Sequence, residues 1–116
     1  MTILHKLITG LIIALGTLHC CFTAFNYRSF SLDAMWFLSA GLAIILAGVL
    51  NLVVIREAGK DRLIWALCII IDAIFAAMFS VALFMLTQPQ VFVGVALFAI
   101  AMICTVFAKN KDTTTR

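Results

Sequence analysis

Four long apolar stretches, separated by short polar segments, dominate this chain. They cover residues 7–25, 34–55, 63–86 and 90–108. A membrane-spanning helix needs about 20 apolar residues, and none of the stretches alternates apolar and polar positions as barrel strands do. The pattern therefore predicts an all-α membrane protein. Because the connections are short, we expect its four transmembrane helices to form an up-down-up-down antiparallel bundle.

Composition agrees with this class. Of the 116 residues, 66% are hydrophobic and 11% are charged, and a soluble domain of this size could not cover so much apolar surface. We expect one domain, residues 1–116, with residues 109–116 as a polar tail. Lys6 and the apolar run after it resemble the start of a signal peptide. The run continues to Phe25, however, so it is interpreted as the first transmembrane helix.

Charge predicts the orientation. Seven of the eight Lys and Arg residues fall in segments that share one side of a four-span topology, namely Lys6, Arg56, Lys60, Arg62, Lys109, Lys111 and Arg116. The other side has only Arg28. Basic residues accumulate on the cytoplasmic side, so we expect both termini in the cytoplasm and the chain in the inner membrane of a bacterium. This bias accounts for the net positive charge, so the expected partner is the lipid bilayer and not nucleic acid.

The candidate site centres on Asp72, the one charged residue within the third apolar stretch. An Asp at the centre of a membrane helix costs about 2.5–3.5 kcal/mol, and such residues normally face a bundle interior, a partner or water. Residues recurring every four positions share a helix face. Two such rows are Ser39, Ala43, Ala47 and Asn51 in the second stretch and Cys68, Asp72, Ala76 and Ser80 in the third. The rows predict close helix packing and place Asp72 on a small, polar face.

Helix rise suggests the partners of Asp72. At about 1.5 Å per residue, Asp72 lies about 13 Å, His19 about 18 Å and Asn51 about 6 Å from the cytoplasmic ends of their predicted helices. We therefore predict a candidate proton or solute site made of Asp72, His19 and Asn51. Such a pair of Asp and His can hold or pass a proton, as relays in transporters do. Alternatively, the same groups only fix the helix register.

Length and span number resemble those of the small multidrug resistance transporters. That family carries its essential Glu in the first helix, where this chain has no acidic residue, so its activity is not transferred. Thiol-oxidising four-helix enzymes need a Cys-x-x-Cys pair, and this chain has only the adjacent Cys20 and Cys21 and the separate Cys68 and Cys104.

The sequence also lacks the ligand sets of haem and zinc sites. His5 and His19, 14 positions apart, would need a third ligand source to hold haem, and no set of residues has the spacing of a zinc site. We expect no metal, no cofactor and no enzymatic activity.

Two functions remain open. The first is a non-enzymatic bundle that acts as an accessory or interaction subunit in the membrane. The alternative is a small homodimeric proton- or cation-coupled transporter that uses the Asp72 and His19 region. A stable homodimer would favour the transporter, and a partner membrane complex would favour the accessory role.

Overall fold

The computed structural model describes residues 2–114, with side chains for residues 2–108. The chain forms four α-helices, α1 (Thr2–Asn26), α2 (Leu32–Glu57), α3 (Arg62–Met85) and α4 (Pro89–Thr114). Each is long enough and apolar enough to cross a membrane, which confirms the predicted all-helical chain with four candidate membrane spans. Two boundaries differ from the expectation. The first helix begins at Thr2, and residues 109–114 continue α4 instead of forming a separate tail, while residues 115–116 lie outside the described part.

Side chains and turn residues define the helix ends. The Ser31 hydroxyl accepts a hydrogen bond from the Ala34 amide (3.2 Å) at the start of α2. The Asp61 carboxylate accepts from the Leu63 and Ile64 amides (2.9 and 3.1 Å) at the start of α3. These caps supply acceptors to amides that have no partner within the helix. At the other end of α2, Ala58 and Gly59 adopt positive φ values of 52° and 69°, which reverses the chain.

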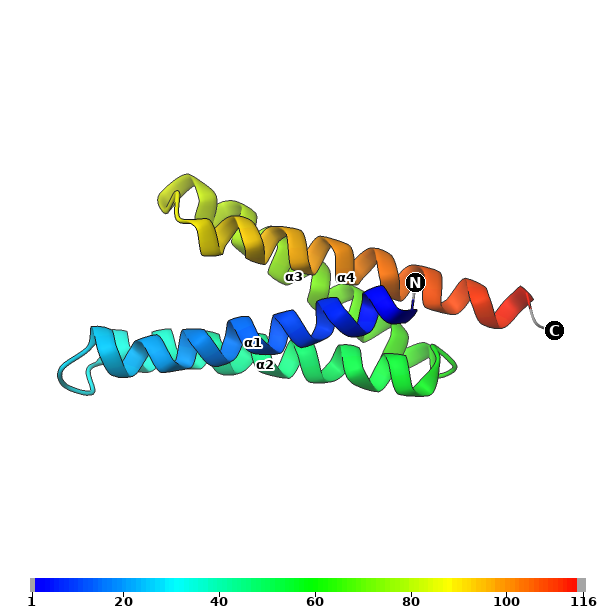
Figure 1. The fold of residues 1–116 in the computed structure, drawn as a ribbon, viewed down its shortest axis with the longest axis horizontal. Coiled ribbons are helices and arrows are strands. Elements are labelled where there is room, and N and C mark those ends of the chain that lie inside the picture. Colours follow the sequence, from blue (N-terminus) through cyan, green and yellow to red (C-terminus); the bar gives the residue numbers. More distant parts are fainter. Residues whose placement is uncertain (1, 115–116) are drawn as a thin grey trace.

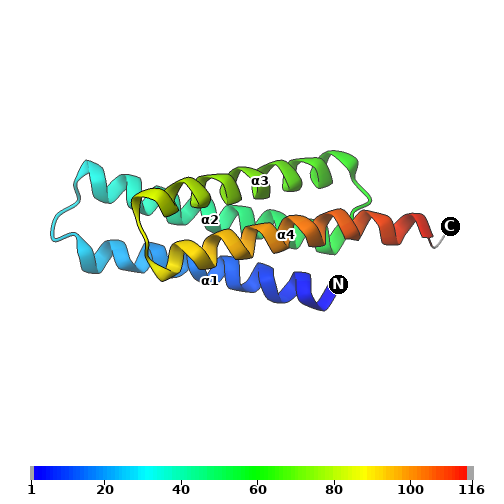
Figure 2. The same cartoon turned by 90° about the horizontal axis from the view of Figure 1, so that it is seen from above.

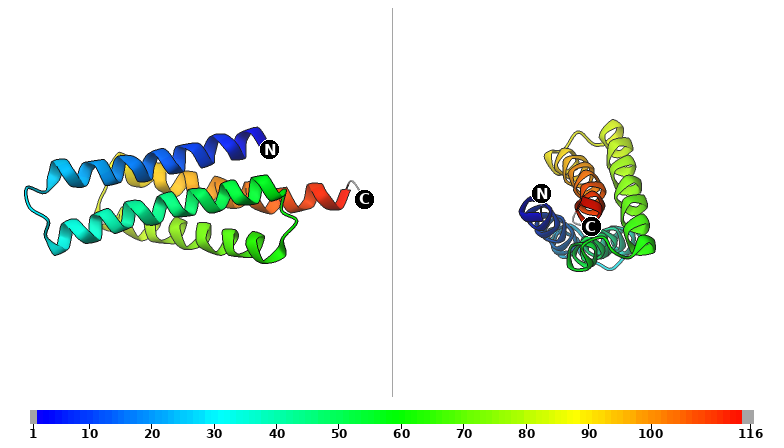
Figure 3. Two further views of the ribbon diagram at one scale, coloured as in Figure 1. Left: turned by 90° about the horizontal axis from the view of Figure 1, so that it is seen from below. Right: turned by 90° about the vertical axis from the view of Figure 1, so that its right-hand side faces the viewer.

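The helices form two antiparallel hairpins, α1 with α2 and α3 with α4 (Figure 1). Both chain termini and the α2–α3 loop lie at one end of the long axis, which we call the terminal end (Figures 1 and 2). The hairpins meet near this end and diverge towards the α1–α2 and α3–α4 loops. The end-on view shows α3 leaning away from α2 along its length (Figure 3). Contact between α2 and α3 is therefore concentrated near the terminal end.

Backbone contact joins α1 to α2. A Cβ atom added to Gly16 would lie 2.8 Å from the Gly41 carbonyl oxygen, and one added to Gly41 would lie 3.0 Å from the Gly16 carbonyl oxygen. Small residues permit such close approach in membranes. The α1–α2 interface thus uses Gly41 and Gly48 of α2, both of which face α1. Ser39, at the start of the predicted row, is exposed.

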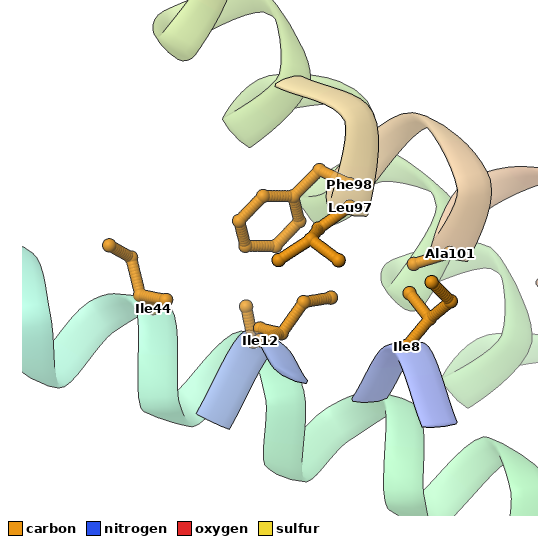
Figure 4. Packing of buried hydrophobic residues seen from close by; sticks show 7 residues of the cluster. Ile8, Ile12, Ile44, Leu97, Phe98 and Ala101 are labelled. Carbon is orange, nitrogen blue, oxygen red and sulfur yellow. The ribbon is translucent and has the colours of Figure 1, made fainter. Parts of the chain in front are cut away.

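Apolar side chains fill the space between the hairpins. Figure 4 shows Ile8 and Ile12 of α1 and Ile44 of α2 facing Leu97, Phe98 and Ala101 of α4. The Phe98 ring stacks on Phe75 and Phe79 of α3, with ring centroids 4.7 and 5.8 Å apart. In α3 only Cys68 and Asp72 are fully enclosed. This helix therefore has a largely free outer surface.

The glycine contact gives a matched test of packing. Gly16→Ala should lower the free energy of unfolding by about 1–3 kcal/mol, because a methyl group there meets backbone that cannot move aside easily. Gly10→Ala is the control, since a Cβ at Gly10 has no atom within 4 Å, and it should be neutral or stabilising by up to about 1 kcal/mol. Unfolding in detergent micelles measures both, and equal effects would contradict a tight contact at Gly16.

Candidate functional site: a buried polar cluster joining four helices

Five buried polar side chains come together near the terminal end. They come from all four helices and are His5 of α1, Asn51 of α2, Cys68 and Asp72 of α3 and Thr105 of α4. His5 is 3% exposed and the other four are fully buried. We call this set the polar cluster. Water and lipid cannot satisfy these groups inside the bundle, so each depends on the others for hydrogen bonds.

The Asn51 side-chain amide lies at the centre of the cluster. Its Nδ2 donates to Asp72 Oδ1 (2.9 Å) and to the Ala47 carbonyl oxygen (3.1 Å). Its Oδ1 is 2.8 Å from His5 Nε2 and 3.5 Å from the Thr105 hydroxyl. Both amide hydrogens are thereby used, and the amide oxygen pairs with His5, while the single Thr105 hydrogen is directed to the closer Ala101 carbonyl oxygen at 2.9 Å. One side chain of α2 is thus hydrogen-bonded to α1 and α3 and lies in polar contact with α4.

Asp72 has only uncharged partners among its recorded hydrogen bonds. Its Oδ1 accepts from Asn51, and its Oδ2 accepts from the Cys68 thiol at 3.7 Å. Cys68 and Asp72 are four residues apart and therefore share a face of α3. An ionised carboxylate here would have no cation as a direct partner within the described side chains.

Thr105 is the α4 member of the polar cluster, and Trp65 of α3 is hydrogen-bonded to its backbone. The Thr105 hydroxyl donates to the Ala101 carbonyl oxygen (2.9 Å) and lies 3.7 Å from the Cys68 sulfur. The Trp65 indole donates to the Thr105 carbonyl oxygen (2.9 Å). Trp65 thus joins α3 to α4 one turn before Cys68, on the side of the polar cluster nearer the α2–α3 loop.

The structure unites two of the three predicted site residues. Asp72 and Asn51 are hydrogen-bonded, but His19 lies elsewhere. Its ring stacks on Phe37 at a centroid distance of 3.9 Å. His19 is 14 residues beyond His5, about 21 Å further along α1, and His5 occupies the place expected for it. The predicted depths were counted from Leu7 and assumed upright helices. In the structure, α1 begins at Thr2 and α3 is inclined.

The spacing of residues along α1 indicates that His5 lies on the buried face of the helix. His5, Ile8, Thr9, Ile12 and Gly16 are all buried, and their spacing of three or four residues marks one face of the helix. Because His5 and Lys6 are polar, the sequence analysis placed the start of the first membrane helix after them, at residue 7. The buried His5 was therefore left outside the predicted helix.

The chemistry available to the polar cluster is hydrogen bonding and proton binding.

A pocket of about 330 Å³ lies away from the polar cluster, at the opposite end of the α1–α2 hairpin, where its lining includes Tyr27, Arg28 and Phe30. Within the described residues, no three His, Cys, Asp or Glu side chains are grouped closely enough to hold a metal ion.

Comparison with known proteins adds no family to this picture. No family model, no curated protein and no solved structure matches the chain. A functional proposal therefore depends on the geometry of the chain itself.

The two histidines should differ in their effect on stability. His5→Phe removes the donor to Asn51 and should lower the free energy of unfolding by about 1–3 kcal/mol, because a buried acceptor loses its partner. His19→Phe keeps an aromatic ring against Phe37 and should change stability by less than about 0.5 kcal/mol. Thermal unfolding of both variants in the same detergent measures the difference. A larger loss for His19→Phe would contradict this assignment.

Proposed function

We propose that this protein is a non-enzymatic accessory or interaction subunit of the bacterial inner membrane, with both termini in the cytoplasm. The orientation follows from the distribution of basic residues. The observation that supports the structural role most strongly is the buried Asn51 amide, which is hydrogen-bonded to side chains of α1 and α3 and lies in polar contact with Thr105 of α4. In this proposal the polar cluster fixes the arrangement of the hairpins, and the outer helix surfaces meet a partner.

The most available partner surface is on α3. Only 11% of the most apolar 18-residue segment of α3 is buried, compared with 28–39% of the corresponding segments in the other three helices. Large apolar side chains recur on its outer face at alternating four- and three-residue steps, as Leu63, Leu67, Ile70 and Ile74. This spacing suits packing against another transmembrane helix. We therefore propose that α3 contacts a helix of a larger membrane complex.

The transporter alternative has one observation in its favour. His5, Asn51 and Asp72 form a continuous hydrogen-bonded chain that begins within the first turns of α1. Asp and His side chains relay protons in membrane transporters, although here an amide, which neither gains nor loses a proton, lies between them. Transport would also require access to Asp72 from the other side of the bundle, where the aromatic stack of Phe75, Phe79 and Phe98 lies. The accessory role is therefore the better supported of the two.

A photo-crosslinking experiment tests the proposed contact. A photoreactive amino acid at Ile74 of α3 should give one discrete protein adduct in native membranes, because this position faces outwards from the least covered helix. Leu46 of α2, which is also exposed, is the matched control and should give lipid adducts only. Equal adducts from both positions, or none from Ile74, would contradict a contact through α3.

A flux measurement separates the two functions. Purified protein in proteoliposomes should give no proton flux with a panel of cationic and neutral solutes. A solute-dependent flux that disappears in a folded Asp72→Asn variant would overturn the accessory role and establish the transporter.

A further inference from the structure

The orientation of the Asn51 amide determines which atoms carry protons in the polar cluster. The Ala47 carbonyl can only accept, so the Asn51 group 3.1 Å from it must be the NH2. The second N–H then points at Asp72, and the amide oxygen faces His5 Nε2 at 2.8 Å. Because that oxygen can only accept, His5 Nε2 must carry a hydrogen. His5 is therefore a donor in this structure, either as the neutral ring or as the imidazolium.

Two sites are left for one further proton. His5 can bind it at Nδ1, and Asp72 can bind it on its carboxyl group. With one proton the pair is neutral, as a neutral ring with a carboxylic acid or as an imidazolium with a carboxylate. With none it carries one negative charge, and with two it carries one positive charge. An uncompensated charge in a water-free interior costs several kcal/mol, so burial favours the one-proton state.

Among the side chains of residues 2–108, no other charged group is hydrogen-bonded to His5 or Asp72. The groups that face Asp72 are His5 through Asn51 from α1 and α2, Cys68 from its own helix, and Thr105 from α4 through Cys68. Cys104, the other buried thiol, precedes Thr105 on α4. Lys6, next to His5, is exposed. The charge of the cluster therefore depends on the protons of His5 and Asp72.

The position of the cluster couples its charge to the packing of the hairpins. Cys68 and Asp72 are the buried residues of α3, and α3 leans away from α2 towards the α3–α4 loop (Figure 3). His5 lies about 5 Å along the axis from the first residue of α1, close to the terminal end, where protons can exchange with water.

We propose that His5 and Asp72, bridged by Asn51, form a single proton-binding site whose occupancy by one proton holds the α3–α4 hairpin against α1 and α2. Gain of a second proton or loss of the first weakens this attachment. The site needs neither a partner nor transport, so it goes beyond the function proposed above and does not depend on it.

The stability of the purified protein as a function of pH tests this site. Wild-type protein in detergent micelles should show greatest stability at intermediate pH, with its unfolding constant rising about tenfold or more towards each side. Asp72→Asn should remove the alkaline change, since no carboxylate can form there. His5→Gln retains an N–H donor and should remove the acidic change. Asp33→Asn, at an exposed position on α2, is the control and should retain the wild-type profile.

Hydrogen exchange of the wild type provides a readout that does not depend on the variants folding. After correction for intrinsic exchange, protection of the α3 amides around Asp72 should vary with pH, while that around the Gly16 and Gly41 contact should not. A cluster that only forms static hydrogen bonds would give the same pH dependence in both regions. That result, or a wild-type stability profile matched by Asp72→Asn and His5→Gln, would overturn the proton site.

Discussion

The hydrogen bonds of the Asn51 amide are the interaction on which the rest of the structure depends. In a bundle surrounded by lipid, apolar side chains gain little by leaving one neighbour for another, so helix association relies on close packing and polar contacts. Asn51 supplies polar contacts to the other three helices at once, with His5 at 2.8 Å and Asp72 at 2.9 Å. His5 and Asp72 thereby obtain hydrogen-bond partners that lipid tails cannot provide. It also accounts for a carboxyl group at a depth where one alone would be costly.

The remaining contacts divide the molecule into two parts with different packing. The α1–α2 hairpin has backbone contact at Gly16 and Gly41, and α3 and α4 are joined by stacked rings of Phe75, Phe79 and Phe98. Between the hairpins, apolar packing is strongest between α1 and α4 (Figure 4). The contact of α2 with α3 depends on the polar cluster, so chemistry at one carboxyl group can influence the position of a whole hairpin.

Much of this fold was predictable from the sequence, because continuous apolar runs identify membrane helices directly. The four-residue rows also placed Asn51 and Asp72 on inward faces, and the structure brings these two side chains together. The choice of histidine was not predictable by the same route. It depends on how far α1 extends and on the inclination of α3, which arise from packing between helices rather than from the spacing within one. His19 consequently took the role in the sequence interpretation that His5 has in the structure.

The most direct test of the account is the coupling energy between Asn51 and Asp72. A double-mutant cycle of Asn51→Ala and Asp72→Ala, measured by reversible unfolding in bilayers, isolates their interaction from the effect of each substitution alone. The account predicts a coupling of about 1–2 kcal/mol, at the upper end of hydrogen bonds in membranes. Exposed Ser39→Ala, paired with Asp72→Ala, should give none. Additive effects of Asn51→Ala and Asp72→Ala would contradict the claim that this hydrogen bond joins the two hairpins.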